Sequence, residues 1–124
     1  MNKKILLFLT TLCLPALIMA YTFTWTLPMG GESYEIGDTI NLEWTSDVPG
    51  FNGDINLFQN GSVYTIASSH YFYYGTQSFQ WVIPSSITIA SDYQIELNLG
   101  STGSWYSSNF SISNTSSGSD DDDG

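Results

Sequence analysis

Hydrophobic and polar residues alternate one by one along much of the chain. Ile40, Leu42 and Trp44, for example, are separated by the polar residues Asn41 and Glu43. A period of two is typical of a β-strand with one buried face, because successive side chains point to opposite sides. The same rhythm marks further short strands at residues 21–26, 54–57, 63–66, 79–83, 93–99 and 110–113. The pattern therefore predicts about seven strands and no helix.

Turn residues separate these strands. Asn60-Gly61 is typical of a tight hairpin turn, and Pro84 and Gly100 each end another run. Alternation with one wet face favours antiparallel sheets, because the strands of parallel sheets are buried on both faces. About seven such strands predict an all-β, Ig-like antiparallel β-sandwich, with a small closed barrel as the alternative architecture.

Three large aromatic residues are expected inside this sandwich. Trp44 and Trp81 occupy hydrophobic positions of their strands and would fill the space between the sheets. Tyr93 follows Ser91-Asp92 near the start of a late strand, where Ig-like domains have a tyrosine corner. All three rings are therefore predicted to be buried.

The two ends of the chain differ from this pattern. Residues 1–20 combine Lys3 and Lys4 with an apolar stretch and the small residue Ala20, which is typical of a cleaved secretory signal peptide. An uncleaved N-terminal anchor is the alternative. Residues 114–124 contain no hydrophobic residue, so we expect a disordered Ser/Asp-rich tail without a signal for lipid attachment. The folded domain is expected at residues 21–113.

The charge of the chain excludes several classes of partner. It has 12 Asp or Glu and two Lys, and both Lys lie within residues 1–20, so the rest carries a charge of −12. Nucleic-acid binding depends on Lys and Arg contacts to phosphate and is therefore excluded. The single Cys also lies within residues 1–20, so no disulfide is expected. The single histidine, His70, is expected in an exposed loop, and we expect no metal site and no cofactor.

Residues with catalytic chemistry are few. Gly100–Ser104 lacks the glycine spacing of a nucleophile elbow. Glu43 and Glu96 are the carboxylates that a glycosidase mechanism could use, but both alternate with hydrophobic neighbours and are expected to face solvent. A catalytic acid needs an apolar pocket that raises its pKa. We therefore predict no enzymatic activity.

The segment SHYFYYG, residues 69–75, places four aromatic residues in a row. Four consecutive rings of a strand cannot all enter one core, because side chains alternate between its faces. One hypothesis is a sugar-stacking surface, since aromatic rings present flat apolar faces and those of Tyr and Trp carry a polar edge. Its candidate residues are Tyr64, Phe72, Tyr74, Trp105 and Tyr106, together with Tyr71 and Tyr73, and the solvated side chains of Asp54 and Gln77 lie nearby. The alternative is structural, with Tyr71 and Tyr73 pointing inward and the other two rings covering a sheet edge.

Three sequences match the acceptor pattern for N-glycosylation, at Asn60, Asn109 and Asn114. The first lies on the predicted hairpin turn and the third in the tail, where both are accessible. The second lies within a predicted strand. A glycoprotein is therefore expected, on the premise that the chain passes through a eukaryotic secretory pathway.

Two segments carry a family resemblance. WTLPMGGESYEIGDTINLEWTSD has a Pro and Gly pair, a second Gly and a strand that closes on Trp, and FQWVIPSSITIASDYQIELNLGSTGSWYSSNFSIS has a strand that ends at Pro, then Tyr-x-Ile and a last strand. Together they resemble the Ser/Thr-rich GPI-anchored membrane protein family, whose N-terminal domain is shared with yeast cell-wall proteins needed for β-1,6-glucan assembly. The matching positions are Pro28, Gly31, Gly37, Trp44, Pro84, Tyr93 and Phe110.

The resemblance implies an Ig-like domain that works outside the cell, at a cell wall or cell surface. Family members continue into a long Ser/Thr-rich stalk, whereas here a few serines and aspartates follow the domain. We therefore expect either a secreted domain or a fragment of a longer protein, and in both cases a non-enzymatic module that binds or scaffolds neutral wall polysaccharide or another wall protein. The alternative is a self-associating structural or adhesion protein with no glycan ligand, because residues 55–91 carry no charged side chain to oppose strand pairing.

Overall fold

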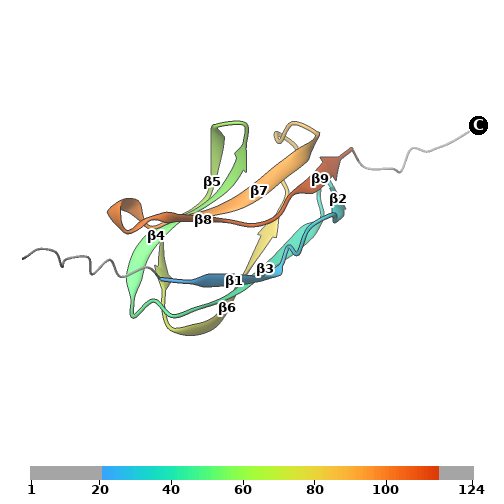
Figure 1. Ribbon diagram of the computed structural model, residues 1–124. Helices are drawn as coiled ribbons and strands as arrows, with labels where there is room; N and C mark the ends of the chain where they lie inside the picture. The colour runs from blue at the N-terminus through green and yellow to red at the C-terminus, as the bar shows by residue number, and fades with distance from the viewer. Residues whose placement is uncertain (1–20, 115–124) are drawn as a thin grey trace, which may run out of the picture.

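A computed structural model describes residues 21–114, which form two β-sheets packed face to face. The smaller sheet consists of β1 (Phe23–Leu27), β3 (Thr39–Ser46) and β6 (Gly75–Val82), in the order β1-β3-β6. The larger sheet has the order β2-β9-β7-β4-β5, with β2 (Ser33–Glu35), β9 (Phe110–Ser113), β7 (Ala90–Asn98), β4 (Phe51–Gln59) and β5 (Ser62–Phe72). A short helix η2 (Gly100–Thr102) precedes β8 (Ser104–Tyr106), which pairs with β7. Figure 1 shows β1, β3 and β6 in the lower layer, with β7, β8 and β9 above them.

The predicted all-β sandwich is confirmed. The strands pair antiparallel except β2 and β9, which run parallel and tie the beginning of the domain to its end. The alternation of Ile40, Leu42 and Trp44 with exposed or half-buried neighbours along β3 gives the pattern expected of a strand with one buried face. The strands β2 and β8 were not predicted, because three residues are too few for a recognisable alternation.

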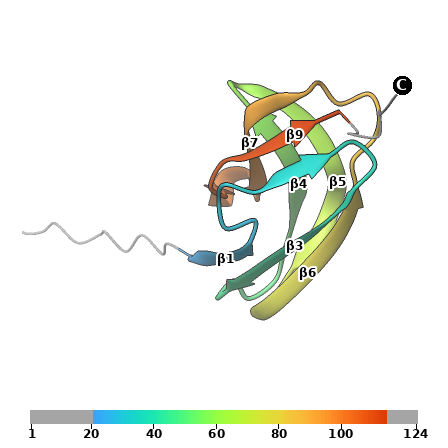
Figure 2. The ribbon, with the colours of Figure 1, turned by 90° about the vertical axis from the view of Figure 1, so that its right-hand side faces the viewer.

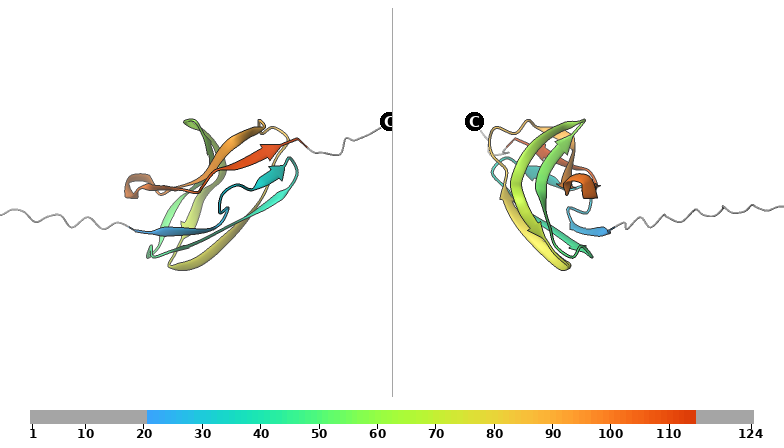
Figure 3. Two further views of the ribbon diagram at one scale, coloured as in Figure 1. Left: turned by 45° about the vertical axis from the view of Figure 1, so that its right-hand side comes forward. Right: turned by 90° about the vertical axis from the view of Figure 1, so that its left-hand side faces the viewer.

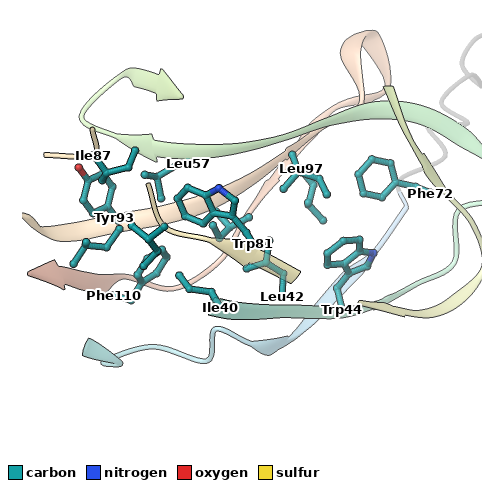
Figure 4. Close-up of a cluster of buried hydrophobic side chains, with 14 of the residues drawn as sticks. Ile40, Leu42, Trp44, Leu57, Phe72, Trp81, Ile87, Tyr93, Leu97 and Phe110 are labelled. Atoms are coloured by element: carbon teal, nitrogen blue, oxygen red, sulfur yellow. The ribbon is translucent and has the colours of Figure 1, made fainter. Parts of the chain in front are cut away.

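Trp44 and Trp81 lie in the core as predicted (Figure 4). The core consists of the inward side chains of both sheets: Ile40, Leu42, Ile55, Leu57, Phe72, Ile95, Leu97, Phe110 and Ile112 surround the two indoles. Fully burying one such side chain stabilises the fold by roughly 1.5–3 kcal/mol. With no cysteine among the described residues, this packing replaces covalent cross-links as the source of stability.

Tyr93 forms the tyrosine corner predicted from its position. Its ring is buried against Phe110, with ring centroids 6.2 Å apart. Its hydroxyl donates a hydrogen bond to the backbone carbonyl of Thr88, five residues upstream. This contact fixes the connection between β6 and β7, as the corresponding tyrosine does in Ig-like sandwiches.

The strands β5 and β6 follow one another in the chain but belong to different sheets, and each is the last strand of its sheet. Figure 2 shows them along the same side of the sandwich. They contact each other through side chains, for example between the rings of Tyr64 and Trp81, 6.2 Å apart. The aromatic segment that contains residues 71–74 is therefore the link between the two layers.

Within residues 21–114, no helix is long and apolar enough to span a membrane. The predicted signal peptide, residues 1–20, and the tail beyond residue 114 lie outside the described residues.

The tyrosine corner can be tested with Tyr93→Phe, which keeps the ring and removes its hydroxyl. The loss of one hydrogen bond should lower the free energy of unfolding by roughly 0.5–1.5 kcal/mol, measured by urea denaturation. Tyr34→Phe is a matched control, because the half-buried Tyr34 makes no hydroxyl hydrogen bond within residues 21–114. Equal stability of the two variants would contradict a structural role for the Tyr93 hydroxyl.

Candidate functional site

The face of the larger sheet that points away from the core, over β5, β4, β7 and β8, is here called the outer face. Its composition follows from the strand register. Asn56 of β4 pairs with Thr65 of β5 on one side and with Glu96 of β7 on the other, and Glu96 pairs with Tyr106 of β8. Because paired residues of antiparallel strands point to the same face, these four side chains form one continuous row, the central row.

Two members of the central row are buried although they lie on the outer face. Asn56 is 4% and Glu96 5% exposed. The Nδ2 atom of Asn56 donates to Glu96 Oε1 and the hydroxyl of Tyr106 donates to Glu96 Oε2, each at 2.9 Å. The hydrogen bond to Glu96 raises the pKa of Tyr106, because it stabilises the protonated phenol.

The prediction that Glu96 faces solvent is therefore wrong. The side chain points outward, as its alternation with Ile95 and Leu97 requires, but Tyr106 on the neighbouring strand contacts it. The register between β7 and β8 decides this burial, and a single strand's alternation carries no information on it.

The rows on either side of the central row differ in chemistry. On one side Phe58 lies between Val63 and Gln94, and its ring centroid is 5.1 Å from that of Tyr106. On the other side a hollow of about 240 Å³ is lined by polar groups that include Asn52, Asp54, Ser69 and Asn98. Figure 3 shows the turn at η2, which closes one side of this hollow, next to β4 and β5.

The far end of the outer face carries the tyrosine turn, which comprises Tyr71, Tyr73 and Tyr74. All three rings are exposed, Tyr74 to 74%, and those of Tyr71 and Tyr73 lie 6.1 Å apart. Tyr71 pairs with Asn52, which places it on the outer face beside the polar hollow. Its hydroxyl lies over Gly50, where a Cβ atom would come within 2.4 Å of it. The outer face therefore has aromatic groups at both ends and polar groups between them.

Gln77 holds the tyrosine turn in place. This side chain was predicted to be solvated, and that prediction is wrong, because it is buried. Its Nε2 atom donates to the carbonyl of Tyr71 at 3.0 Å, and its Oε1 atom accepts from the backbone N–H of Tyr73 at 3.2 Å. One amide thereby fixes the chain on both sides of Phe72.

His70 is half-buried within β5, so its prediction as an exposed loop residue is wrong. The rings of Phe72, Phe79 and Trp44 surround it in edge-on contacts, with centroids 4.8, 5.6 and 6.0 Å from the imidazole. Its Nε2 atom lies 3.4 Å from Gln77 Nε2. Burial lowers the pKa of His70, because the charged form loses hydration.

The seven aromatic residues predicted as candidates for sugar stacking do not share one surface. Phe72 is fully buried against Trp44, so it cannot present a face to a ligand (Figure 4). Trp105 is half-buried on Phe23, with ring centroids 4.7 Å apart. The structural alternative, in which Tyr71 points inward and Phe72 covers a sheet edge, is also wrong. Tyr71 is exposed and Phe72 is buried in the core.

The other predicted aromatic residues are all exposed, namely Tyr64, Tyr71, Tyr73, Tyr74 and Tyr106. Of these, only Tyr106 lies in the central row. Tyr64 lines a separate hollow of about 270 Å³ between the β4–β5 hairpin and the β6–β7 connection, beside Leu57 and Ile87. The outer face instead brings together Tyr106, Phe58 and Tyr71.

The arrangement of carboxylates bears on catalysis. Glu43 lies on β3 in the smaller sheet, paired with Ser78, whereas Glu96 lies on the outer face of the larger sheet. The two carboxylates therefore do not face one another across a common cleft, as glycoside hydrolysis requires. Within the described residues, no group of three or more His, Cys, Asp or Glu side chains is placed to hold a metal ion.

The three predicted glycosylation positions are all exposed. Asn60 lies in the turn between β4 and β5 with a φ of 47°, Asn109 lies just before β9, and Asn114 follows it. Asn109 therefore lies outside the strand in which it was predicted.

Comparison of the chain with protein-family models, with curated proteins and with solved structures finds no match.

His70 predicts a dependence of stability on pH. Its pKa in the folded state lies below the ordinary value of 6.5, so the unfolded chain binds a proton more readily. The free energy of unfolding should have its full value above about pH 7, where His70 is neutral in both states, and should decrease as the pH drops below roughly 6.5. Urea denaturation at pH 7.5 and 5.5 measures the difference.

His70→Phe is the control for this measurement, because the chain has one histidine and carboxylates titrate mainly at lower pH. The variant should lose the difference between the two pH values. A variant as sensitive to pH as the original protein would contradict the assignment to His70.

Proposed function

We propose that this protein is a secreted, non-enzymatic module that binds neutral cell-wall polysaccharide along the outer face. One observation carries the proposal: the half-buried Phe58 with the exposed Tyr106 toward one end of the outer face, and the exposed Tyr71 at the other, enclose hydroxyl, amide and carboxylate groups of several strands. A sugar chain combines flat apolar ring faces with many hydroxyls, and so fits alternating aromatic and polar rows.

The charge of the domain favours an uncharged ligand. Residues 21–114 contain eight Asp or Glu and no Lys or Arg. An acidic polymer would be repelled by this surface and would find no cationic side chain to contact, whereas the hydroxyls of a neutral glycan can donate to carboxylate and amide oxygens. Exposed Tyr rings combine apolar faces with a polar edge, as contact with a hydrated sugar requires.

The resemblance to the wall-glucan assembly domain supports the same proposal. It suggests β-glucan as the polymer class, a wall-associated or surface location, and glycosylation at the exposed Asn60, Asn109 and Asn114. The separation of Glu43 from Glu96 supports binding or scaffolding without turnover. The alternative partner for the outer face is another wall protein.

The proposal is tested by co-sedimentation of the purified protein with insoluble β-1,6-glucan, β-1,3-glucan and mannan. Replacement of Tyr71 and Tyr73 by Ala should weaken glucan binding by roughly tenfold or more, because each aromatic contact contributes about 0.5–1.5 kcal/mol. Val82→Ala removes an equally exposed apolar side chain from the smaller sheet and should have no effect.

Thermal unfolding of each variant separates binding from folding. Weaker binding by a variant with an unchanged melting temperature supports the outer face as the site. Absence of binding to all three polymers by the original protein, or binding that the double variant retains in full, would reject the proposal.

The second candidate function is self-association at the edge of β5. This strand is 11 residues long, ends its sheet, and carries no charged side chain that would oppose pairing with a second copy. Ser68→Lys places a charge on the exposed edge strand and should abolish concentration-dependent association in light scattering without glycan. Ser101→Lys, in the exposed turn at η2, changes the net charge equally and should leave association intact. A monomer at all concentrations would exclude this function.

A further inference from the structure

The central row contains more hydrogen-bond acceptors than donors. A carboxylate has two acceptor oxygens, and Glu96 receives one hydrogen bond at each. Asn56 uses its Nδ2 atom for one of them, while its Oδ1 atom is buried and has no partner within the described residues. Because the nitrogen and oxygen of an amide diverge, this oxygen is not directed at the carboxylate. The row therefore has an unused acceptor beside a buried charge that no cation neutralises.

Such a group destabilises the fold, because a buried acceptor loses its hydrogen bonds to water. An apolar residue at position 56 would avoid this loss, as Ile55 and Leu57 do on the other face of the strand. The retained polar pair is explained if a donor reaches the row from outside. Tyr106 is the group positioned to admit it, because its ring is 43% exposed and it belongs to a strand of three residues.

We propose that the central row is a subsite for one sugar ring, and that Tyr106 acts as its cover. Two neighbouring hydroxyls of the sugar donate to Glu96 Oε2 and Asn56 Oδ1, and the first replaces the hydroxyl of Tyr106. The rings of Tyr106 and Phe58, 5.1 Å apart, then contact the apolar face of the sugar. This inference rests on the proposed function and assigns its specificity to Asn56 and Glu96.

A sugar fits this row better than an ammonium group does. The row also offers donors, the Nδ2 atom of Asn56 and the hydroxyl of Thr65, next to its acceptors. A hydroxyl both donates and accepts, whereas an ammonium group only donates.

Tyr106→Phe tests the cover, because it keeps the ring and removes the hydroxyl that competes with the ligand for Glu96. It should bind soluble β-1,6-gluco-oligosaccharide about tenfold more tightly than the original protein in isothermal titration calorimetry, since one internal hydrogen bond no longer has to be broken. Tyr34→Phe loses a hydroxyl away from the outer face and should bind like the original protein.

Glu96→Gln tests the acceptors. A carboxamide keeps one oxygen that accepts from Asn56 Nδ2, and its nitrogen can donate to the Tyr106 hydroxyl oxygen, so both contacts of residue 96 are retained and the melting temperature should not fall. The acceptor that the sugar hydroxyl needs at the Oε2 position is lost, so oligosaccharide binding should weaken about tenfold. Binding by the original protein that neither variant alters would overturn the subsite and leave the proposed function standing. Binding of a tetralysine peptide to Tyr106→Phe in place of the oligosaccharide would also overturn it. Absence of oligosaccharide binding by all variants and by the original protein rejects both proposals.

Discussion

The absence of cationic side chains is the constraint on which the described domain depends. Without Lys or Arg, a carboxylate can be satisfied only by neutral donors or by water. Six of the eight carboxylates accept such bonds: Glu32 from Met29 and Gly30, Asp38 from Glu35, Asp47 from Thr22, Asp54 from Ser69, Asp92 from Gln59 and Asn60, and Glu96 from Asn56 and Tyr106. Burial raises the pKa of Glu32, but its backbone hydrogen bonds outweigh this effect and leave the pKa below the ordinary value. The acidic residues therefore shape turns and strand contacts.

The architecture was predictable because its main signals are local. Alternation identifies the buried phase of β3 at Ile40, Leu42 and Trp44, and Tyr93 has a position that a tyrosine corner requires. The segment of four rings was not predictable in this way, since either phase could have entered the core. Opposite Gly53–Asn56, β5 has two bulges, each with one extra residue. The first bulge exchanges the inward and outward positions of β5 and the second exchanges them back, so Phe72 points inward.

The candidate site depends on register, which a single strand does not reveal. Alternation placed Asn56 and Glu96 on the outer side of their strands, but it could not show that they are neighbours or that the Tyr106 hydroxyl bonds to Glu96. The partners of Gln77 and His70 likewise come from the meeting of β5 and β6 at the side of the sandwich. Contacts between segments distant in the sequence thus explain why the sequence analysis missed Asn56 as a site residue and wrongly predicted Glu96, Gln77 and His70 to be exposed.

The parallel strands β2 and β9 pair Ser33 with Ser111, two residues that lie near opposite ends of the domain's sequence. During synthesis β2 can find its neighbour only when the last strand has emerged, whereas the β4–β5 hairpin can form locally. During synthesis the chain therefore holds a folded β4–β5 hairpin and a β2 segment that has no partner. A cell that makes this protein must keep that incomplete intermediate from aggregating until the final residues of the domain arrive.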